Sequence, residues 1–201
     1  QATIAVFALF QYLFVLGEDI ATALFHSASS LTTTGFHIHP ASGWSDTQKL
    51  LSSIQMIIGG GNGSTAGGIK LFRFIIILYL AGWFIRHAVL PQKTNSPLKY
   101  DRRVISNTEM KEIFAFFIIY LIILSVSTLI FTLTGHSTFD SLFESASSLG
   151  TVGLSSGITR PSLPFYLKTV LIFNMWAGRI EILSVLILFN PFIWSLKRRK
   201  K

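Results

Sequence analysis

His26-Ser-Ala-Ser-Ser-Leu-Thr-Thr-Thr-Gly-Phe36 and Glu144-Ser-Ala-Ser-Ser-Leu-Gly-Thr-Val-Gly-Leu154 are two copies of one motif, 118 residues apart and identical at seven of eleven positions. An acidic start and an apolar segment precede each copy, and a polar loop and an interrupted apolar segment follow it. Such self-similarity indicates a duplicated structural unit. We therefore predict a first repeat at residues 1–86, a basic linker at 87–108, a second repeat at 109–196 and a basic tail at 197–201.

The composition indicates an all-α membrane protein. Only 13% of the residues are charged, against about 25% in a soluble domain, and the mean hydropathy is +0.56. Ile113–Leu133 is 21 residues long without a charge, which as a helix spans about 30 Å, the thickness of a bilayer core. The apolar segments Ile69–Ile85 and Leu163–Leu196 carry few charges. The first residues, Gln1–Leu16, lack the features of a signal peptide, so we interpret them as a membrane helix or the remainder of one, in a piece of a longer protein.

The basic residues favour a cytoplasmic linker and tail. The net charge is +8, but eleven of the 17 lysines and arginines lie in or beside these two segments. Such clustering is typical of cytoplasmic loops and argues against a nucleic-acid partner. Linker and tail on one side require an even number of membrane crossings between them. The basic residues concerned are Arg86, Lys93, Lys99, Arg102, Arg103, Lys111, Lys197, Arg198, Arg199, Lys200 and Lys201.

The segment before each motif turn is too short to cross a bilayer. Ile20–Leu31 has 12 residues, about 18 Å as a helix. We expect it and its counterpart to be re-entrant pore helices that enter and leave on one face, so that each repeat has a membrane-pore-membrane arrangement. Ser137 and Asp140 have the spacing of a capping box at the start of the second short helix.

Two Thr-x-Gly turns follow the short helices, and they have the character of a cation filter. Dehydrating K⁺ requires a ring of oxygens, which backbone carbonyls supply where a glycine avoids side-chain collisions. The helix before each turn directs its negative end toward the ion. A plain helix-ending turn is the alternative for one copy, but duplication in register favours the filter. The first Thr-x-Gly turn comprises Thr33, Thr34, Gly35 and Phe36, and the second comprises Thr151, Val152, Gly153 and Leu154.

A glycine loop at residues 59–68 interrupts the apolar segment of the first repeat. Six glycines in ten residues break a helix, since each costs about 1 kcal/mol there. Irregular backbone at membrane depth lies against protein or a wet cavity, which predicts a cavity beside the loop. Gly61–Ala66 fits a dinucleotide fingerprint but lacks its βαβ context, and Gly63–Lys70 does not complete a phosphate-binding P-loop.

Four strings resemble the TrkH/KtrB family of potassium transport subunits: Thr32-Thr-Thr-Gly-Phe36, Gly60-Gly-Asn-Gly-Ser-Thr-Ala-Gly-Gly-Ile-Lys70, Gly150-Thr-Val-Gly-Leu-Ser155 and Gly178-Arg-Ile-Glu-Ile-Leu183. The resemblance covers nearly the whole chain. It implies K⁺ transport by a subunit with four such repeats around one pore, of which this chain resembles the third and fourth. The missing first two repeats, or a second copy of this chain, would then complete the pore, and the full subunit would form a homodimer. No cofactor is expected, K⁺ being the permeant ion.

The resemblance also implies a gate. The glycine loop would close the pore below the filter, with Lys70 beside it, and a cytosolic nucleotide-binding ring of the TrkA/KtrA type would regulate it. Arg179, in an otherwise apolar segment, would face the cavity and repel cations; the alternative is an arginine that reaches the interface and meets Glu181 of another unit. The predicted gate residues are Gly59, Gly60, Gly61, Asn62, Gly63, Ser64, Thr65, Ala66, Gly67, Gly68, Lys70 and Arg179.

Further interpretations remain open. His26 and Glu144 occupy matching positions, where a polar residue tunes a filter or, the reading we favour, lies on the helix surface at the interface. His37 and His39 resemble half of a metal site without a third ligand nearby. Nothing supports catalysis. The rival functions are a non-conducting membrane scaffold or sensor, and a two-repeat K⁺ channel that works as a homodimer in the plasma membrane.

Overall fold

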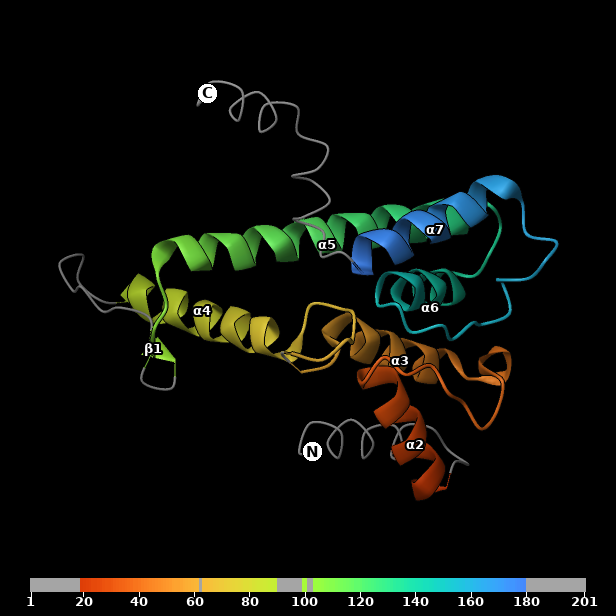
Figure 1. Ribbon diagram of the computed structural model, residues 1–201, viewed down its shortest axis with the longest axis horizontal. Coiled ribbons are helices and arrows are strands. Elements are labelled where there is room, and N and C mark those ends of the chain that lie inside the picture. The colour runs from red at the N-terminus through yellow and green to blue at the C-terminus, as the bar shows by residue number, and fades with distance from the viewer. Residues whose placement is uncertain (1–18, 62, 90–98, 101–102, 180–201) are drawn as a thin grey trace, which may run out of the picture.

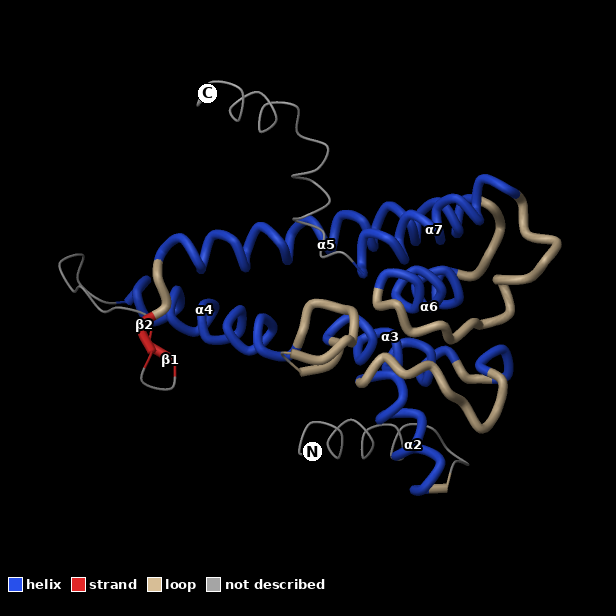
Figure 2. The backbone as a smooth tube through the Cα atoms, in the orientation of Figure 1, coloured by secondary structure: helices blue, strands red, loops and turns tan. Residues whose placement is uncertain are grey.

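The computed structural model of the chain describes residues 19–61, 63–89, 99–100 and 103–179, and this part is mostly helical (Figures 1 and 2). The predicted helix within residues 1–16, Asn62, the part of the second repeat after residue 179 and the tail at 197–201 lie outside the described residues. The elements in chain order are α2 (Ile20–Leu31), η1 (Ala41–Gly43), α3 (Asp46–Ile58), α4 (Leu71–Val89), β1 (Lys99–Tyr100), β2 (Arg103–Val104), α5 (Asn107–Leu133), α6 (Thr138–Leu149) and α7 (Phe165–Arg179).

The duplicated motif forms two helices of equal length. Helix α2 has the predicted bounds, and α6 also has 12 residues. Ser137 caps α6 by accepting a hydrogen bond from the backbone N–H of Asp140, as predicted. The Asp140 carboxylate pairs instead with Lys49 of α3, at 2.7 Å. This ion pair therefore joins the first repeat to the second.

The two repeats differ after their turns. Helix α3 ends at Ile58, where Gly59 adopts a φ of 72°, so the glycine loop breaks the helix as predicted. Helix α7 of the second repeat remains helical at the equivalent positions, through to Arg179. Arg179 therefore stands on a helix at the position where the first repeat has Gly61 in a loop.

Helix α5 is the one described helix long and apolar enough to cross a membrane, over Thr108–Leu133. Only 28% of its most apolar window is buried, which is unlike the core helix of a soluble protein. Leu71–Trp83 in α4 is a shorter apolar stretch. The lateral face of α5 exposes large side chains such as Ile122 and Leu133, as a surface in contact with lipid does.

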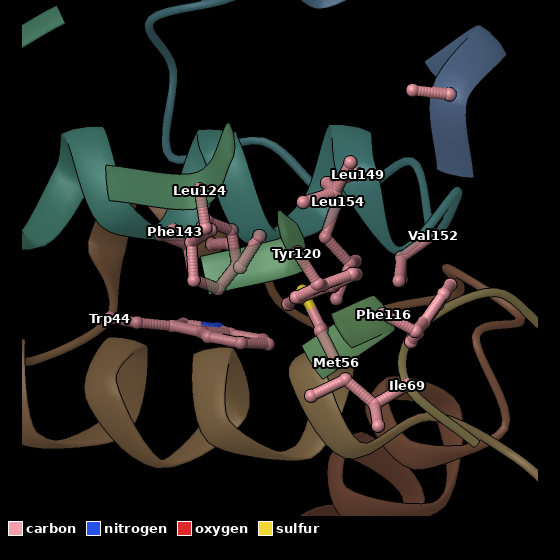
Figure 3. Close-up of a cluster of buried hydrophobic side chains, with 13 residues drawn as sticks. Trp44, Met56, Ile69, Phe116, Tyr120, Leu124, Phe143, Leu149, Val152 and Leu154 are labelled. Carbon is pink, nitrogen blue, oxygen red and sulfur yellow. The ribbon is translucent and has the colours of Figure 1, made fainter. Parts of the chain in front are cut away.

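The largest hydrophobic core joins the two repeats (Figure 3). In Figure 1, α6 lies between the α5–α7 pair and α3, and α2 lies beyond α3. Trp44 and Met56 from the first repeat meet Phe143 from α6, and Tyr120 of α5 covers them. The ring centroids of Trp44 and Phe143 are 5.8 Å apart, edge to face. Among the residues that the structure describes, α6 is thus enclosed by three helices and α2 packs mainly against α3; the segment before α2, which corresponds to α5, lies outside them.

A small hairpin departs from the all-helical prediction. Strands β1 and β2, in the linker, pair antiparallel with Lys99 opposite Val104 and Tyr100 opposite Arg103. Two residues connect them, a length that suits a hairpin. The charged composition of the linker gave no periodic signal for strands so short.

Candidate functional site

The two Thr-x-Gly turns have the same backbone conformation. Thr33 and Thr151 adopt φ angles of 55° and 54°, and Gly35 and Gly153 adopt 82° and 95°. In the first turn the Thr34 N–H donates to the Ser29 carbonyl at 2.9 Å. In the second, the Val152 N–H donates to Ser147 at the same distance. The duplication thus extends from sequence to individual dihedral angles.

The positive φ angles of the two threonines are a strained feature. A β-branched residue rarely adopts the left-handed conformation, and such outliers cost about 1–3 kcal/mol each. Finding the same outlier at Thr33 and Thr151 argues for a shared requirement, since one accident would not repeat. Strain of this kind gathers at ligand-binding sites, where the surrounding structure maintains it.

A serine of each short helix holds the exit of its turn. The Ser29 hydroxyl donates to the carbonyl oxygen of Phe36, and the Ser147 hydroxyl donates to that of Leu154, both at 2.6 Å. The two exits differ in exposure, since Phe36 is 68% exposed and Leu154 only 2%. The serines therefore fix equivalent carbonyls in unequal surroundings.

The two turns touch each other. A Cβ atom added to Gly35 would overlap the carbonyl oxygen of Val152. With its positive φ, this contact makes Gly35 irreplaceable without a backbone shift. The structure therefore brings the two predicted filter segments side by side, although 118 residues separate them.

The glycine loop lies against both turns. The Gly67 N–H donates to the Thr33 hydroxyl at 3.3 Å, and a Cβ atom at Gly67 would overlap the carbonyl oxygen of Gly150, just before the second turn. From α7, the Arg179 guanidinium donates to the Thr65 carbonyl at 2.9 Å. The loop is thus tied to the first turn on one side and to Arg179 on another.

Two cavities flank this arrangement. A cavity of about 140 Å³ lies beside the glycine loop, as predicted, and is lined by residues 64–68, Lys70, Arg73 and Arg179 among others. A second cavity, of about 530 Å³, runs along the second Thr-x-Gly turn from Glu144 to Arg179. Arg179 lines both, so its charge stands between the loop and the second turn.

His26 and Glu144 are buried, and our favoured interpretation of them as helix-surface residues is wrong. Their exposed fractions are 0% and 3%. His26 Nε2 accepts from the Ile38 N–H at 3.2 Å, and Glu144 accepts from Ser155, Ser156 and Thr159. The overlooked signal in the sequence is the Ser-Ala-Ser-Ser run that follows each of them. Such small side chains let neighbouring elements pack closely around the short helix.

The predicted site residues that the structure describes therefore form one cluster of the two turns, the glycine loop and Arg179. Lys70, with a φ of 71°, follows the loop and lines the smaller cavity. No group of three potential metal ligands occurs among the described residues, and His37 and His39 belong to the polar loop after the first turn. Glu181, the other partner considered for Arg179, lies outside the described residues.

Comparison with known proteins identifies relatives along nearly the whole chain. The profile of the TrkH family, described as a cation transport protein, matches residues 12–196. An uncharacterized cation transporter of Methanocaldococcus jannaschii is 32% identical over 182 residues, which are 90% of this chain and 38% of that protein. The Trk system potassium uptake protein TrkH of Escherichia coli is 29% identical over 178 residues, 87% of this chain and 37% of that protein.

The fold also has a solved counterpart. The crystal structure of the potassium transporter TrkH from Vibrio parahaemolyticus matches 96% of this chain and 42% of its own, with a TM-score of 0.81 and 25% sequence identity. The chain thus spans about two-fifths of the length of these relatives. The helical architecture is that of a membrane transporter.

Proposed function

Because this chain belongs to the TrkH family of cation transport proteins, we propose that it translocates K⁺ across the plasma membrane along a path lined by the carbonyls of its two Thr-x-Gly turns. The observation that carries the proposal is the pair of left-handed threonines, Thr33 and Thr151. Each stands two residues before a left-handed glycine. Strained, duplicated turns that touch each other are suited to presenting carbonyl oxygens to one ion.

The short helices support this role. Helices α2 and α6 have 12 residues each, about 18 Å, and in our proposal they are re-entrant pore helices. Their C-terminal ends meet the turns, where the partial negative charge of a helix terminus of about −0.5 favours a cation. The flanking apolar helices would cross the bilayer, with the linker and the tail in the cytoplasm.

The glycine loop and Arg179 form the proposed gate. The loop contacts Thr33 through Gly67 and is bonded to Arg179 through Thr65. A guanidinium beside the ion path repels cations, so the path would open when the loop and Arg179 move apart. Because the loop touches both turns, such a movement would also shift the turns, where the ion is selected.

Two turns supply two quarters of a four-part carbonyl ring. By resemblance to the family, the remaining quarters come from two further repeats, and a cytosolic nucleotide-binding ring regulates the gate. In that arrangement this chain corresponds to the third and fourth repeats. A second copy of the chain is the other source of the missing quarters.

The test is rubidium uptake into liposomes that contain the folded chain, alone and together with two further repeats of a family member, with Na⁺ as competitor. We expect Rb⁺ uptake that resists Na⁺ once four turns are present, and its loss in Gly153→Val. Gly43→Val is the matched control, since a Cβ atom at Gly43 meets nothing within 4 Å. Absence of uptake from every folded assembly would favour a non-conducting scaffold, and uptake by the chain alone would favour a homodimeric channel.

A further inference from the structure

Glu144 is a buried acid behind the second Thr-x-Gly turn. It lies in α6, one turn of helix before Ser147 and Ser148, and is 3% exposed. Its carboxyl group faces the chain that leaves the turn rather than the turn itself. The contacts proposed for K⁺ leave Glu144 without a role, although burying an acid is costly unless hydrogen bonds compensate for it.

Four hydrogen bonds converge on this carboxyl group. Oε1 accepts from the Ser155 hydroxyl, from the Ser156 hydroxyl at 3.4 Å and from the Thr159 N–H at 3.3 Å. Oε2 accepts from the Thr159 hydroxyl at 2.9 Å. The three hydroxyls and the Thr159 N–H thus all donate to this carboxyl group, which accepts at both oxygens. Hydrogen bonds to a charged acceptor are stronger than neutral ones, so the loop at residues 155–159 is firmly attached to α6.

This attachment reaches the carbonyls of the turn. Ser147 holds the Leu154 carbonyl, and Glu144 holds the next residue, Ser155. Ser147 and Glu144 both lie on α6, and they contact the residues on either side of the Leu154–Ser155 peptide bond. Glu144 also lines the 530 Å³ cavity together with Gly153. The position of the last carbonyls in the second turn thus depends on Glu144.

The first repeat lacks this carboxylate clamp. His26 replaces Glu144 and accepts from the backbone of Ile38. The positions equivalent to Ser155 and Thr159 are His37 and Ala41, which offer no hydroxyl. The two turns therefore share a backbone conformation and the serine that holds their exits, but only the second has the additional carboxylate clamp.

We propose that Glu144 is a positioning residue that sets the ion discrimination of the second Thr-x-Gly turn by clamping residues 155–159. This inference rests on the proposed function and adds to it that the two turns contribute unequally. The second turn, held by charge-assisted hydrogen bonds, selects K⁺ strictly, and the first tolerates other cations more readily.

The test compares K⁺ with Na⁺ in the assembled transporter by two readouts. One is the rise in thermal unfolding temperature with each ion, since an ion bound to the folded state stabilises it. The other is the ratio of Rb⁺ to Na⁺ uptake. We expect Glu144→Gln to lower the K⁺ preference by about tenfold, the effect of losing one hydrogen bond to a charged group. The control is Asp140→Asn, an acid of the same helix that pairs with Lys49 and should leave the preference unchanged.

The donors give an independent check. The double variant Ser155→Ala/Thr159→Val should lower the preference as Glu144→Gln does, and combining all three changes should lower it little further, because they remove one network. Full additivity, or a lower unfolding temperature without ions and an unchanged preference, would overturn the inference. If the unaltered protein prefers K⁺ and Glu144→Gln does too, only this inference fails; if the unaltered protein has no K⁺ preference, the proposed function fails with it.

Discussion

The two short helices begin differently, although they carry the same motif. Ser137 caps α6 by accepting a hydrogen bond from the Asp140 N–H, whereas α2 has no side-chain cap hydrogen bond. Among the described residues α6 packs against α3, α5 and α7, and α2 packs mainly against α3; the segment that precedes α2, the counterpart of α5, lies outside them. The same motif, with seven identical positions of eleven, is therefore capped unequally. The local sequence sets the conformation of a turn, but its surroundings set how firmly the turn keeps it.

The largest effect expected from this comparison concerns the turn glycines. Gly35→Ala should cost about 3 kcal/mol or more, because its Cβ atom would overlap Val152 and the backbone must shift. Gly153→Ala should cost about 1 kcal/mol, since only its φ of 95° is unfavourable and nothing described lies within 4 Å of the new atom. Titration with SDS in mixed micelles measures both. Equal losses would show that the turns do not rely on their mutual contact.

The next effect concerns Asn174 of α7 and the residue at the equivalent position of α3, Met56. Asn174, 0% exposed, accepts from Ser127 at 3.0 Å and donates to Ser148 at 3.2 Å. Asn174→Leu should cost about 2–3 kcal/mol, because two hydroxyls lose a partner in the interior. Met56 is its buried counterpart, and Met56→Leu should cost less than about 1.5 kcal/mol. Titration with SDS again measures the loss of stability. A similar loss in both variants would show that the hydrogen bonds of Asn174 do not distinguish the second repeat from the first.

The ion pair between the repeats should have a smaller effect. Lys49→Met should cost about 1–2 kcal/mol by leaving Asp140 without its 2.7 Å partner. Adding Asp140→Leu should recover most of that loss, because replacing a partly buried ion pair by apolar residues is often neutral. Thermal unfolding of the single and double variants provides the measurement. A double variant less stable than either single one would mean that the pair itself stabilises the junction.

The smallest effect concerns the strained threonines. Thr151→Gly should stabilise the protein by about 1 kcal/mol, because glycine relieves the left-handed strain. Thr33→Gly should be nearly neutral, since it also removes the hydroxyl that accepts from Gly67. Unfolding temperatures in a buffer without K⁺ measure the difference. A stabilisation by Thr33→Gly as large as that by Thr151→Gly would argue that the glycine loop is not tied to the first turn.

Local features of the site were predictable from the sequence. The bounds of α2, the Ser137 cap and the break at Gly59 follow from residues close together in the chain. The burial of Glu144 was missed, because its partners Ser155 and Thr159 lie beyond the turn and no periodic pattern connects them to it. The pair of Lys49 and Asp140 joins residues 91 positions apart, and only the packing of α3 on α6 brings them together.

That ion pair also fixes how the two repeats meet. Lys49 has Leu167 as its counterpart in the second repeat, and Asp140 has Thr22 as its counterpart in the first. The junction joins the α3 position of the first repeat to the α6 position of the second. The converse pairing would place Leu167 opposite Thr22. Only the observed pairing carries complementary charges, so the ion pair specifies which face of the first repeat meets the second.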